Sequence, residues 1–330
     1  MTAPTLPAEL KAALDARLQG VSRNAAAERA ALISQTYRDG GGSSAIRSEA
    51  DALAYALARM PATYAAVTAS LNALREIRPD FAPASLLDIG AGPGTAAWSA
   101  AAAFPSLTSF ALLDANSALR TLALDLGGDS TRLRKMTYRR GEARAALADS
   151  EAADLVIASY MIGEIGDAER TALAELMWAK TRDTLLIVEP GTSAGYRRII
   201  ALRRQLIAAG ANVAAPCPHD RECPLRAPDW CHFTQRLPRS RAHKQLKSAE
   251  LPYEDEKFSY VALSRAPAAR HPARVIAQPV VTKVAVTARL CTDQGILNAG
   301  AARRQKAAYQ RFKKIAWGDA IFDPDHGQAE

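Results

Sequence analysis

A glycine-rich loop is the feature that most constrains how this chain can fold. Residues 86–95 read Leu-Leu-Asp-Ile-Gly-Ala-Gly-Pro-Gly-Thr, so an apolar run leads into glycines at positions 90, 92 and 94. The alanine-rich stretch 96–103 that follows favours a helix. Glycine permits a tight turn between strand and helix, and the helix N-terminus offers free N–H groups to a ligand. The loop therefore predicts an α/β fold with a ligand at the carboxyl end of a strand.

The spacing of these glycines indicates the class of ligand. A dinucleotide-binding loop has the pattern G-x-G-x-x-G, whereas this loop has G-x-G-x-G preceded by Asp88. The pattern resembles motif I of class I S-adenosylmethionine methyltransferases. The resemblance implies that Asp88, Gly90, Gly92 and Gly94 form the cofactor loop, with Asp88 near the methionine end of S-adenosylmethionine.

Two further acidic residues complete the expected cofactor site. Asp114 ends the next apolar run, where a carboxylate can accept hydrogen bonds from both ribose hydroxyls. Glu142 follows Arg140 and Gly141, at the position where a third acidic loop faces the adenine in such proteins. The alternative for Glu142 is an ordinary exposed glutamate.

The remaining chain predicts three regions. Apolar runs at 86–89, 110–113, 155–158, 185–188 and 260–263 alternate with helical stretches, which is typical of a doubly wound, mostly parallel sheet. We expect a class I S-adenosylmethionine methyltransferase (Rossmann-like) sheet within residues 79–267, with a Cys-rich metal-binding insertion at 211–240. Residues 1–78 are expected to be a helical extension with a turn at 40–44. Residues 268–330 are expected to be basic and β-rich, with strands at 275–276 and 280–287 and either strand or helix at 301–317.

The sequence assigns no catalytic residue. The run 154–165 lies where such folds present the methyl acceptor, but it lacks the Asn-Pro-Pro-Tyr of amino-group methylases. Ser159, Tyr160 and Glu164 are candidates by position, with packing or helix capping as the alternative. Glu189 ends the following strand, where it either contacts substrate or orders the loop. Methyl transfer can rest on alignment of the reactants, so the lack of an assigned base does not exclude it.

Positive charge is concentrated in two segments. Residues 196–247 contain eleven basic and three acidic residues, and residues 265–314 contain eleven basic residues and one acidic residue, within a chain of net charge +8. Clustered Lys and Arg gain free energy by displacing counterions from phosphates. The segregation indicates a nucleic-acid partner, and a solvated basic face is the alternative.

The four cysteines predict a metal site. Cys217, Cys223 and Cys231 lie within fifteen residues, and Cys291 is the only other cysteine. In a protein without signs of secretion this favours metal over disulfides. Four thiolates suit tetrahedral zinc or an iron–sulfur cluster. His219 or His232 is the alternative to Cys291 as fourth ligand, and the general alternative is a set of unrelated buried thiols.

A series of motifs resembles one protein family. In order, they are the glycine loop, Glu-Pro-Gly-Thr at 189–192, Cys-Pro-His-x₃-Cys-Pro-Leu at 217–225, Trp-Cys-His-Phe at 230–233, Phe-Ser-Tyr-Val-Ala-Leu-Ser-Arg at 258–265, Leu-Cys-Thr at 290–292 and Trp-Gly-Asp at 317–319. Together they resemble the small-ribosomal-subunit methyltransferase-like family, which includes a mitochondrial assembly factor and bacterial relatives. The resemblance covers about residues 30–320.

The resemblance implies a specific function. Cys217, Cys223, Cys231 and Cys291 would hold a [4Fe–4S] cluster, and the protein would bind S-adenosylmethionine and associate with small-subunit ribosomal RNA during assembly. The leading hypothesis is a methyltransferase acting on that RNA or on assembly intermediates. A non-catalytic assembly factor with the same fold, and a small-molecule methyltransferase with a structural zinc, remain alternatives.

The sequence also carries an expectation about location. No run approaches the ~18 apolar residues of a membrane span. The first twenty residues contain Glu9 and Asp15 and lack an apolar run before a cleavage site. We therefore expect a cytoplasmic protein that has no membrane partner.

Overall fold

The computed structural model describes residues 3–38, 40–239, 244, 251–269 and 272–322. They form two compact units that each combine several segments of the chain. Unit 1 comprises 1–72, 82–188 and 235–256, and unit 2 comprises 73–81, 189–234 and 257–330. No helix in the described ranges is long and apolar enough to cross a membrane.

The N-terminal part is helical, as its periodicity predicts. Its helices are α1 (Ala8–Arg17), α2 (Arg23–Arg38) and α3 (Glu49–Ile77), and the turn predicted at 40–44 leads into a short 3₁₀ helix, η1 (Ser43–Ala45). Helix α3 is buried over much of its length, with Leu71 and Leu74 fully covered.

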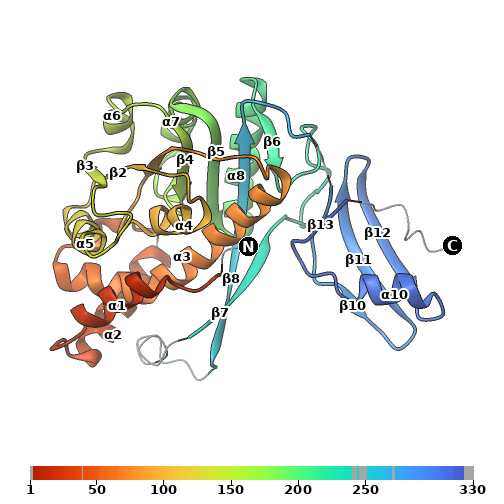
Figure 1. Cartoon of the computed structure of the whole chain (residues 1–330), viewed down its shortest axis with the longest axis horizontal. Helices are drawn as coiled ribbons and strands as arrows, with labels where there is room; N and C mark the ends of the chain where they lie inside the picture. Colours follow the sequence, from red (N-terminus) through yellow and green to blue (C-terminus); the bar gives the residue numbers. More distant parts are fainter. Residues whose placement is uncertain (1–2, 39, 240–243, 245–250, 270–271, 323–330) are drawn as a thin grey trace. The chain divides into compact units, whose positions relative to one another are not determined.

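The glycine loop follows the first strand of a mixed sheet of eight strands (Figure 1). The strands are β1 (Ser85–Ile89), β2 (Ser109–Asp114), β3 (Thr137–Arg140), β4 (Ala153–Ser159), β5 (Thr181–Pro190), β6 (Asn212–Ala215), β7 (Phe233–Pro238) and β8 (Tyr253–Ser264). Their hydrogen-bonded order is β3-β2-β1-β4-β5-β8-β6, with β7 beside β8. Neighbours from β3 to β5 are parallel, whereas β6 is antiparallel to β8. This is the class I methyltransferase arrangement of a Rossmann-like sheet.

Five helices follow strands of this sheet. They are α4 (Thr95–Ala103), α5 (Ser117–Gly128), α6 (Ala143–Ala148), α7 (Asp167–Ala179) and α8 (Ser193–Ala208), with a 3₁₀ turn, η2 (Ile162–Glu164), after β4. The central strands are apolar almost without interruption because helices cover parallel sheets on both faces. The runs predicted at 86–89, 110–113, 155–158, 185–188 and 260–263 all lie within strands. Strands β3, β6 and β7 are too short or too polar to have been predicted.

A second, smaller sheet lies in unit 2. It consists of β9 (Ala273–Val275), β10 (Val280–Val281), β11 (Ala285–Thr292), β12 (Gly295–Ala302) and β13 (Ala320–Ile321). Val286 and Leu290 of β11 form its core together with Tyr309 and Phe312 of helix α10 (Lys306–Phe312). The predicted single strand at 280–287 is therefore wrong, because the chain turns between β10 and β11. The segment 301–317, for which strand or helix was expected, contains the helix.

Candidate functional site

The glycine loop adopts a backbone that side chains disfavour. Gly90, Gly92 and Gly94 have φ angles of 64°, 53° and 81°, all in the left-handed region. A Cβ atom at Gly90 would lie 2.6 Å from the Cβ of Met161, whereas one at Gly92 would meet nothing nearer than 3.9 Å. Gly90 is thus required by packing as well as by conformation, and Gly92 leaves open space above the backbone.

Asp114 holds this loop from the end of β2. One carboxylate oxygen accepts from the Gly92 N–H at 2.8 Å, and the other accepts from the Asn116 N–H at 2.8 Å. The Tyr138 hydroxyl donates to the Gly92 carbonyl at 2.7 Å. Burial raises the pKa of Asp114, and the nearby Glu142 carboxylate adds to the shift. Asp114 and Glu142 thus form an acidic pair that suits a ligand with hydroxyl or amine donors.

A cavity of about 470 Å³ in unit 1 opens over this loop. Gly90, Gly92, Asp114 and Glu142 line it, and its size lies within the range of small-molecule sites. Gly94 is not among its lining residues. Four of the six residues expected from the sequence therefore surround one cavity.

Asp88 lies beneath the loop rather than at the cavity. It is fully buried and is also absent from the cavity lining. Burial raises the pKa of Asp88 to about 8, although the backbone N–H of Ala97 favours the carboxylate. Burial therefore favours the protonated, neutral form of this side chain, which does not line the cavity.

The N-terminal helical part contributes lining residues that the sequence did not predict. Tyr37, Ser43, Tyr55 and Arg59 all line the cavity. The rings of Tyr37 and Tyr55 stack with centroids 5.9 Å apart. Helical periodicity reports burial and not ligand contact, so no local signal distinguished these residues. In this N-terminal part, the sequence singled out only the turn at 40–44.

Asn116 anchors that turn to the sheet. Its amide donates to the carbonyls of Ser43 and Ile46, both at 2.9 Å. Its oxygen accepts from the Leu119 N–H at 3.0 Å and so caps helix α5. The Ser43 N–H in turn donates to Glu164 at 3.0 Å. The part of the cavity wall formed by Ser43 and Ser44 is therefore held by side chains from the segments that follow β2 and β4.

The three candidates after β4 lie at the same cavity. Ser159, Tyr160 and Glu164 line it, and Tyr160 has a φ angle of 57°, which is unusual for a residue other than glycine. Its hydroxyl donates to Glu256 at 2.8 Å, and Arg59 lies 3.7 Å from the same carboxylate oxygen. Glu256 is buried, so this carboxylate fixes the direction of the Tyr160 ring. Glu189 instead pairs with Arg198 at 2.7 Å in unit 2.

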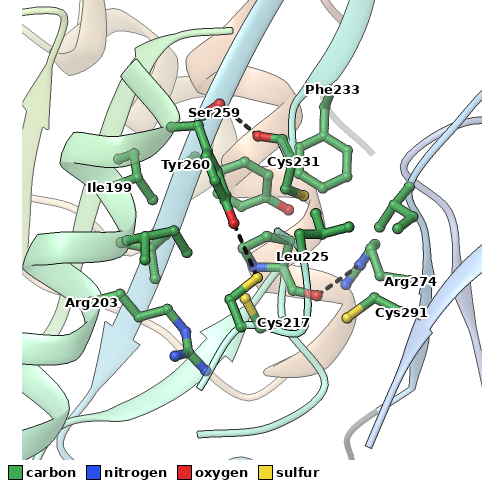
Figure 2. Close-up of a pocket in the computed structure, with 16 residues that line it drawn as sticks. Ile199, Arg203, Cys217, Leu225, Cys231, Phe233, Ser259, Tyr260, Arg274 and Cys291 are labelled. Atoms are coloured by element: carbon green, nitrogen blue, oxygen red, sulfur yellow. Dashed lines mark hydrogen bonds between the residues drawn. The ribbon is translucent and has the colours of Figure 1, made fainter. Parts of the chain in front are cut away.

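All four cysteines line a second cavity, which lies within unit 2 (Figure 2). Cys217 follows β6, Cys223 lies in the next loop, Cys231 precedes β7 and Cys291 belongs to β11. None forms a disulfide. Burial raises the pKa of Cys231 well above its ordinary value, and the three other thiols add to that shift. Burial likewise raises the pKa of Cys291 to about 12. The thiols are therefore close enough to influence one another electrostatically.

The thiols do not form a ready coordination shell. Among the described residues, no three Cys, His, Asp or Glu side chains converge closely enough to hold a metal ion as they stand. The metal-binding insertion expected from the sequence is therefore not shown. His219 and His232 do not line the cysteine cavity, whereas Cys291 does. The chain thus brings together the four thiols and not a mixed Cys–His set.

Two buried arginines border the same cavity. Arg203 is 3% exposed and Arg274 is 2% exposed, and both lie beside the cysteines in Figure 2. Arg203 donates to the His219 carbonyl at 2.5 Å. Arg274 donates to the carbonyls of Pro216 and Gly318 at 3.2 and 2.8 Å. Both guanidinium groups act to lower the pKa of Cys217, against the effect of burial. They favour the thiolate form that metals bind.

The basic segments are less uniformly exposed than their charge indicates. Arg203 and Arg274 are buried, and Arg289 is paired with Asp229 at 2.7 Å. Arg241, Lys247 and Arg270 lie outside the described residues. The exposed cations without a carboxylate partner in the described chain include Lys283, Arg303 and Arg304.

The sequence has identifiable relatives. Residues 49–322 match the family model described as mitochondrial small ribosomal subunit Rsm22. The human mitochondrial ribosome assembly protein METTL17 is 28% identical over 293 residues, which cover 83% of this chain and 63% of the human protein. Rsm22-cox11 tandem protein 2, a mitochondrial protein of Schizosaccharomyces pombe, is 23% identical over 355 residues, which cover 92% of this chain and 47% of that protein. The chain thus matches 63% of the length of the human relative and 47% of the length of the yeast relative.

Solved structures resemble the chain more remotely. N-methyltransferase NodS from Bradyrhizobium japonicum aligns with a TM-score of 0.38 and 12% identity, over 61% of this chain and 87% of its own. Magnesium protoporphyrin IX methyltransferase from Synechocystis aligns with a TM-score of 0.37 and 11% identity, over 63% of this chain and 84% of its own.

The relatives correct one expectation from the sequence. The prediction of a cytoplasmic protein is wrong, because the matching family and both relatives are named as mitochondrial. The composition of the first twenty residues does not carry the information needed to assign a compartment.

Proposed function

This chain belongs to the mitochondrial small ribosomal subunit Rsm22 family, and on that premise we propose that it is an S-adenosylmethionine-binding, methyltransferase-like factor in assembly of the small ribosomal subunit. It would act on small-subunit ribosomal RNA or its assembly intermediates. It would carry a [4Fe–4S] cluster on its four cysteines, with zinc as the alternative metal. The compartment implied by the named relatives is the mitochondrion.

The single observation that carries the cofactor proposal is the cavity over the glycine loop. Gly90, Gly92, Asp114 and Glu142 line it together. Its acidic pair offers acceptors for ribose hydroxyls and the adenine amine, while the left-handed glycines leave backbone exposed to a ligand. S-adenosylmethionine would supply an electrophilic methyl group there. Tyr37, Ser43 and Arg59 would close the cavity from the N-terminal side.

The charge distribution supports an RNA partner. The segment 265–314 carries eleven basic residues against one acidic residue, and Lys283, Arg303 and Arg304 are exposed. Binding driven by such residues releases counterions from phosphate, so it weakens steeply as salt is raised.

Although the four thiols do not converge as they stand, the buried charges around the cysteine cavity support the proposed metal centre. A dication, whether Zn²⁺ or the 2+ form of a [4Fe–4S] core, leaves net negative charge on four thiolates. The buried guanidinium groups of Arg203 and Arg274 carry the compensating charge. Tyr196 adds a hydrogen bond to Cys223, with its oxygen 3.2 Å from Sγ. A closed metal site would tie the loop 217–231 to strand β11.

One observation supports a second reading, in which the protein is a non-catalytic assembly factor. The Tyr160 hydroxyl, at the acceptor side of the cavity, is already engaged by Glu256, which also faces Arg59. The side chain is thus committed to a contact within the protein. Under this second reading, the cofactor would stabilise the fold without transferring its methyl group.

Two measurements test these proposals. Calorimetric titration with S-adenosylmethionine should show binding that Asp114→Asn weakens by about tenfold or more, because one of two backbone N–H groups loses its acceptor. Asp80→Asn, the same change at an exposed site outside the cavity, should bind as the parent chain does. No binding to the parent chain would refute the cofactor proposal.

Methyl transfer separates the two readings of the function. The full chain would be incubated with methyl-labelled cofactor, free small-subunit RNA and isolated assembly intermediates. Label in RNA establishes the enzyme. Cofactor binding without label in any RNA or intermediate establishes the non-catalytic factor.

A further inference from the structure

One end of the C-terminal sheet exposes an unusual set of side chains. Val280 and Val281 of β10 are 57% and 53% exposed, and Val284 in the following turn is 72% exposed. These three valines lie within five residues. Exposed apolar side chains gathered in this way mark interaction sites more often than isolated ones do.

Three cations lie at the same end of the sheet as these valines. Lys283 lies in the turn between β10 and β11, and the Arg303 N–H donates to the Val284 carbonyl at 2.7 Å. The Arg303 guanidinium donates to the Lys283 carbonyl at 3.4 Å, and Arg304 follows. Lys283, Arg303 and Arg304 are exposed, and within the described ranges no carboxylate pairs with them.

Charge is segregated along strand β11. Register places Ala285 opposite Ala302 at the cationic end, and Thr292 opposite Gly295 at the other end. Asp293 lies in the turn at that other end, close in sequence to Cys291. Six residues separate Ala285 from Cys291, a distance of about 20 Å along a strand. The cationic end is therefore remote from both the acidic turn and the cysteine cavity.

The cationic turn is held in one conformation. The Thr282 hydroxyl donates to the Ala285 carbonyl at 2.9 Å and accepts from the Ala285 N–H at 3.0 Å. The Gln305 side chain accepts from the Ala302 N–H at 2.8 Å. Both connections at this end are thus fixed by local hydrogen bonds, and little conformational entropy would be lost on binding.

We propose that Lys283, Arg303 and Arg304, with Val284 in the same turn, form a docking surface for the phosphate backbone of an RNA helix. The proposal rests on the proposed function and deepens it by locating the contact. Three cations that no carboxylate of the described residues pairs with complement phosphate, which is the commonest contact in nucleic-acid complexes. The wide, shallow minor groove of RNA exposes riboses, against which the exposed Val284 would pack.

The test uses the full chain and a labelled RNA stem-loop of about 20 base pairs. Binding is measured by fluorescence anisotropy over a series of salt concentrations. The triple variant Lys283→Ala, Arg303→Ala, Arg304→Ala should weaken binding and flatten the plot of log affinity against log salt by about 2 units of slope, since each lost phosphate contact removes about 0.7–0.9. Val284→Thr should weaken binding without changing the slope, because it alters no charge.

A matched triple variant controls for net charge. Arg182→Ala, Arg197→Ala, Arg204→Ala removes the same charge at exposed positions on β5 and α8, and it should bind more tightly than the first triple variant. Equal losses in the two would overturn the proposal, because charge alone would then explain binding.

Three other outcomes are informative. Full RNA affinity in the first triple variant, with loss of binding to isolated small subunits, would identify a protein partner and overturn the RNA assignment. If the parent chain binds no RNA, the proposed function fails. If it binds and the first triple variant binds equally well, only the docking surface fails.

Discussion

Replacing Arg274 by methionine tests whether the buried arginines serve a metal. Arg274→Met removes two hydrogen bonds, to the carbonyls of Pro216 and Gly318. A buried carbonyl without a donor costs about 1–3 kcal/mol. Only the Pro216 carbonyl is buried, whereas water can reach the partly buried Gly318, so the loss is about 1–3 kcal/mol. The same change removes a buried charge whose carboxylate partner, Glu76, is 3.9 Å away. Removing the cost of burying the Arg274 charge stabilises the fold by several kcal/mol. In metal-free protein this gain largely offsets the loss of the hydrogen bonds.

The metal-loaded form of the proposed four-cysteine site should respond differently, because that site would be anionic. Two unit charges about 8 Å apart interact by about 2 kcal/mol at an effective dielectric constant of about 20. A site with two net negative charges would therefore lose about 4 kcal/mol on removal of Arg274. At about 2–4 °C per kcal/mol for a domain of moderate size, the loaded form should lose roughly 8–16 °C more in Tm than the metal-free form.

The assay is thermal unfolding by circular dichroism, on protein reconstituted without oxygen and on protein stripped of metal. Iron and sulfide content are measured on the same samples. Arg289→Met is the control, because its ion pair with Asp229 is partly exposed and is worth about 0–1 kcal/mol. An equal Tm change in the loaded and stripped forms of Arg274→Met would refute the reasoning, since no metal charge would then be compensated.

Three further predictions concern the loop, the buried acid and the cysteines. Gly90→Ala should lower stability and cofactor affinity more than Gly92→Ala, because only the former places a Cβ 2.6 Å from Met161. Thermal unfolding and calorimetric titration of the two variants measure the difference. Equal losses in both variants would contradict the packing argument. The pKa of Asp88 is about 8 in the folded protein and about 4 unfolded, so the folded state binds more protons between these values. Stability should fall as pH rises from about 4 to 8, and Asp88→Asn should flatten that slope in denaturant titrations; an unchanged slope would show that Asp88 ionises normally. Cys231→Ala should lower iron content and the stability of the C-terminal half, because three thiolates leave the shell open; unchanged Tm and metal content would count against a four-cysteine site.

The sequence predicted those elements that depend on local pattern. Apolar runs marked β1, β2, β4, β5 and β8, because buried strands are apolar over their whole length. The polar strand β3 (Thr137–Arg140) gave no such signal. The run 280–287 is mostly β-branched, and its turn lacks Gly and Pro, so nothing local marked the reversal at Thr282.

The sequence could not predict contacts between distant segments. Tyr37 and Arg59 reach the cavity because Asn116 fixes residues 43–46, a pairing across about seventy residues. The same limit applies to Arg203 and Arg274, which were counted among the basic residues expected to face a polyanion. Their burial follows from tertiary packing, which composition does not report.

The position of Cys291 on β11 fixes the order in which the four cysteines become available during synthesis of the chain. Cys217, Cys223 and Cys231 leave the ribosome well before Cys291, which lies sixty residues beyond Cys231. During that interval a nascent chain would present three thiols without the fourth. In the proposed four-cysteine site, metal insertion would therefore follow synthesis of β11, which pairs with β9 and β12.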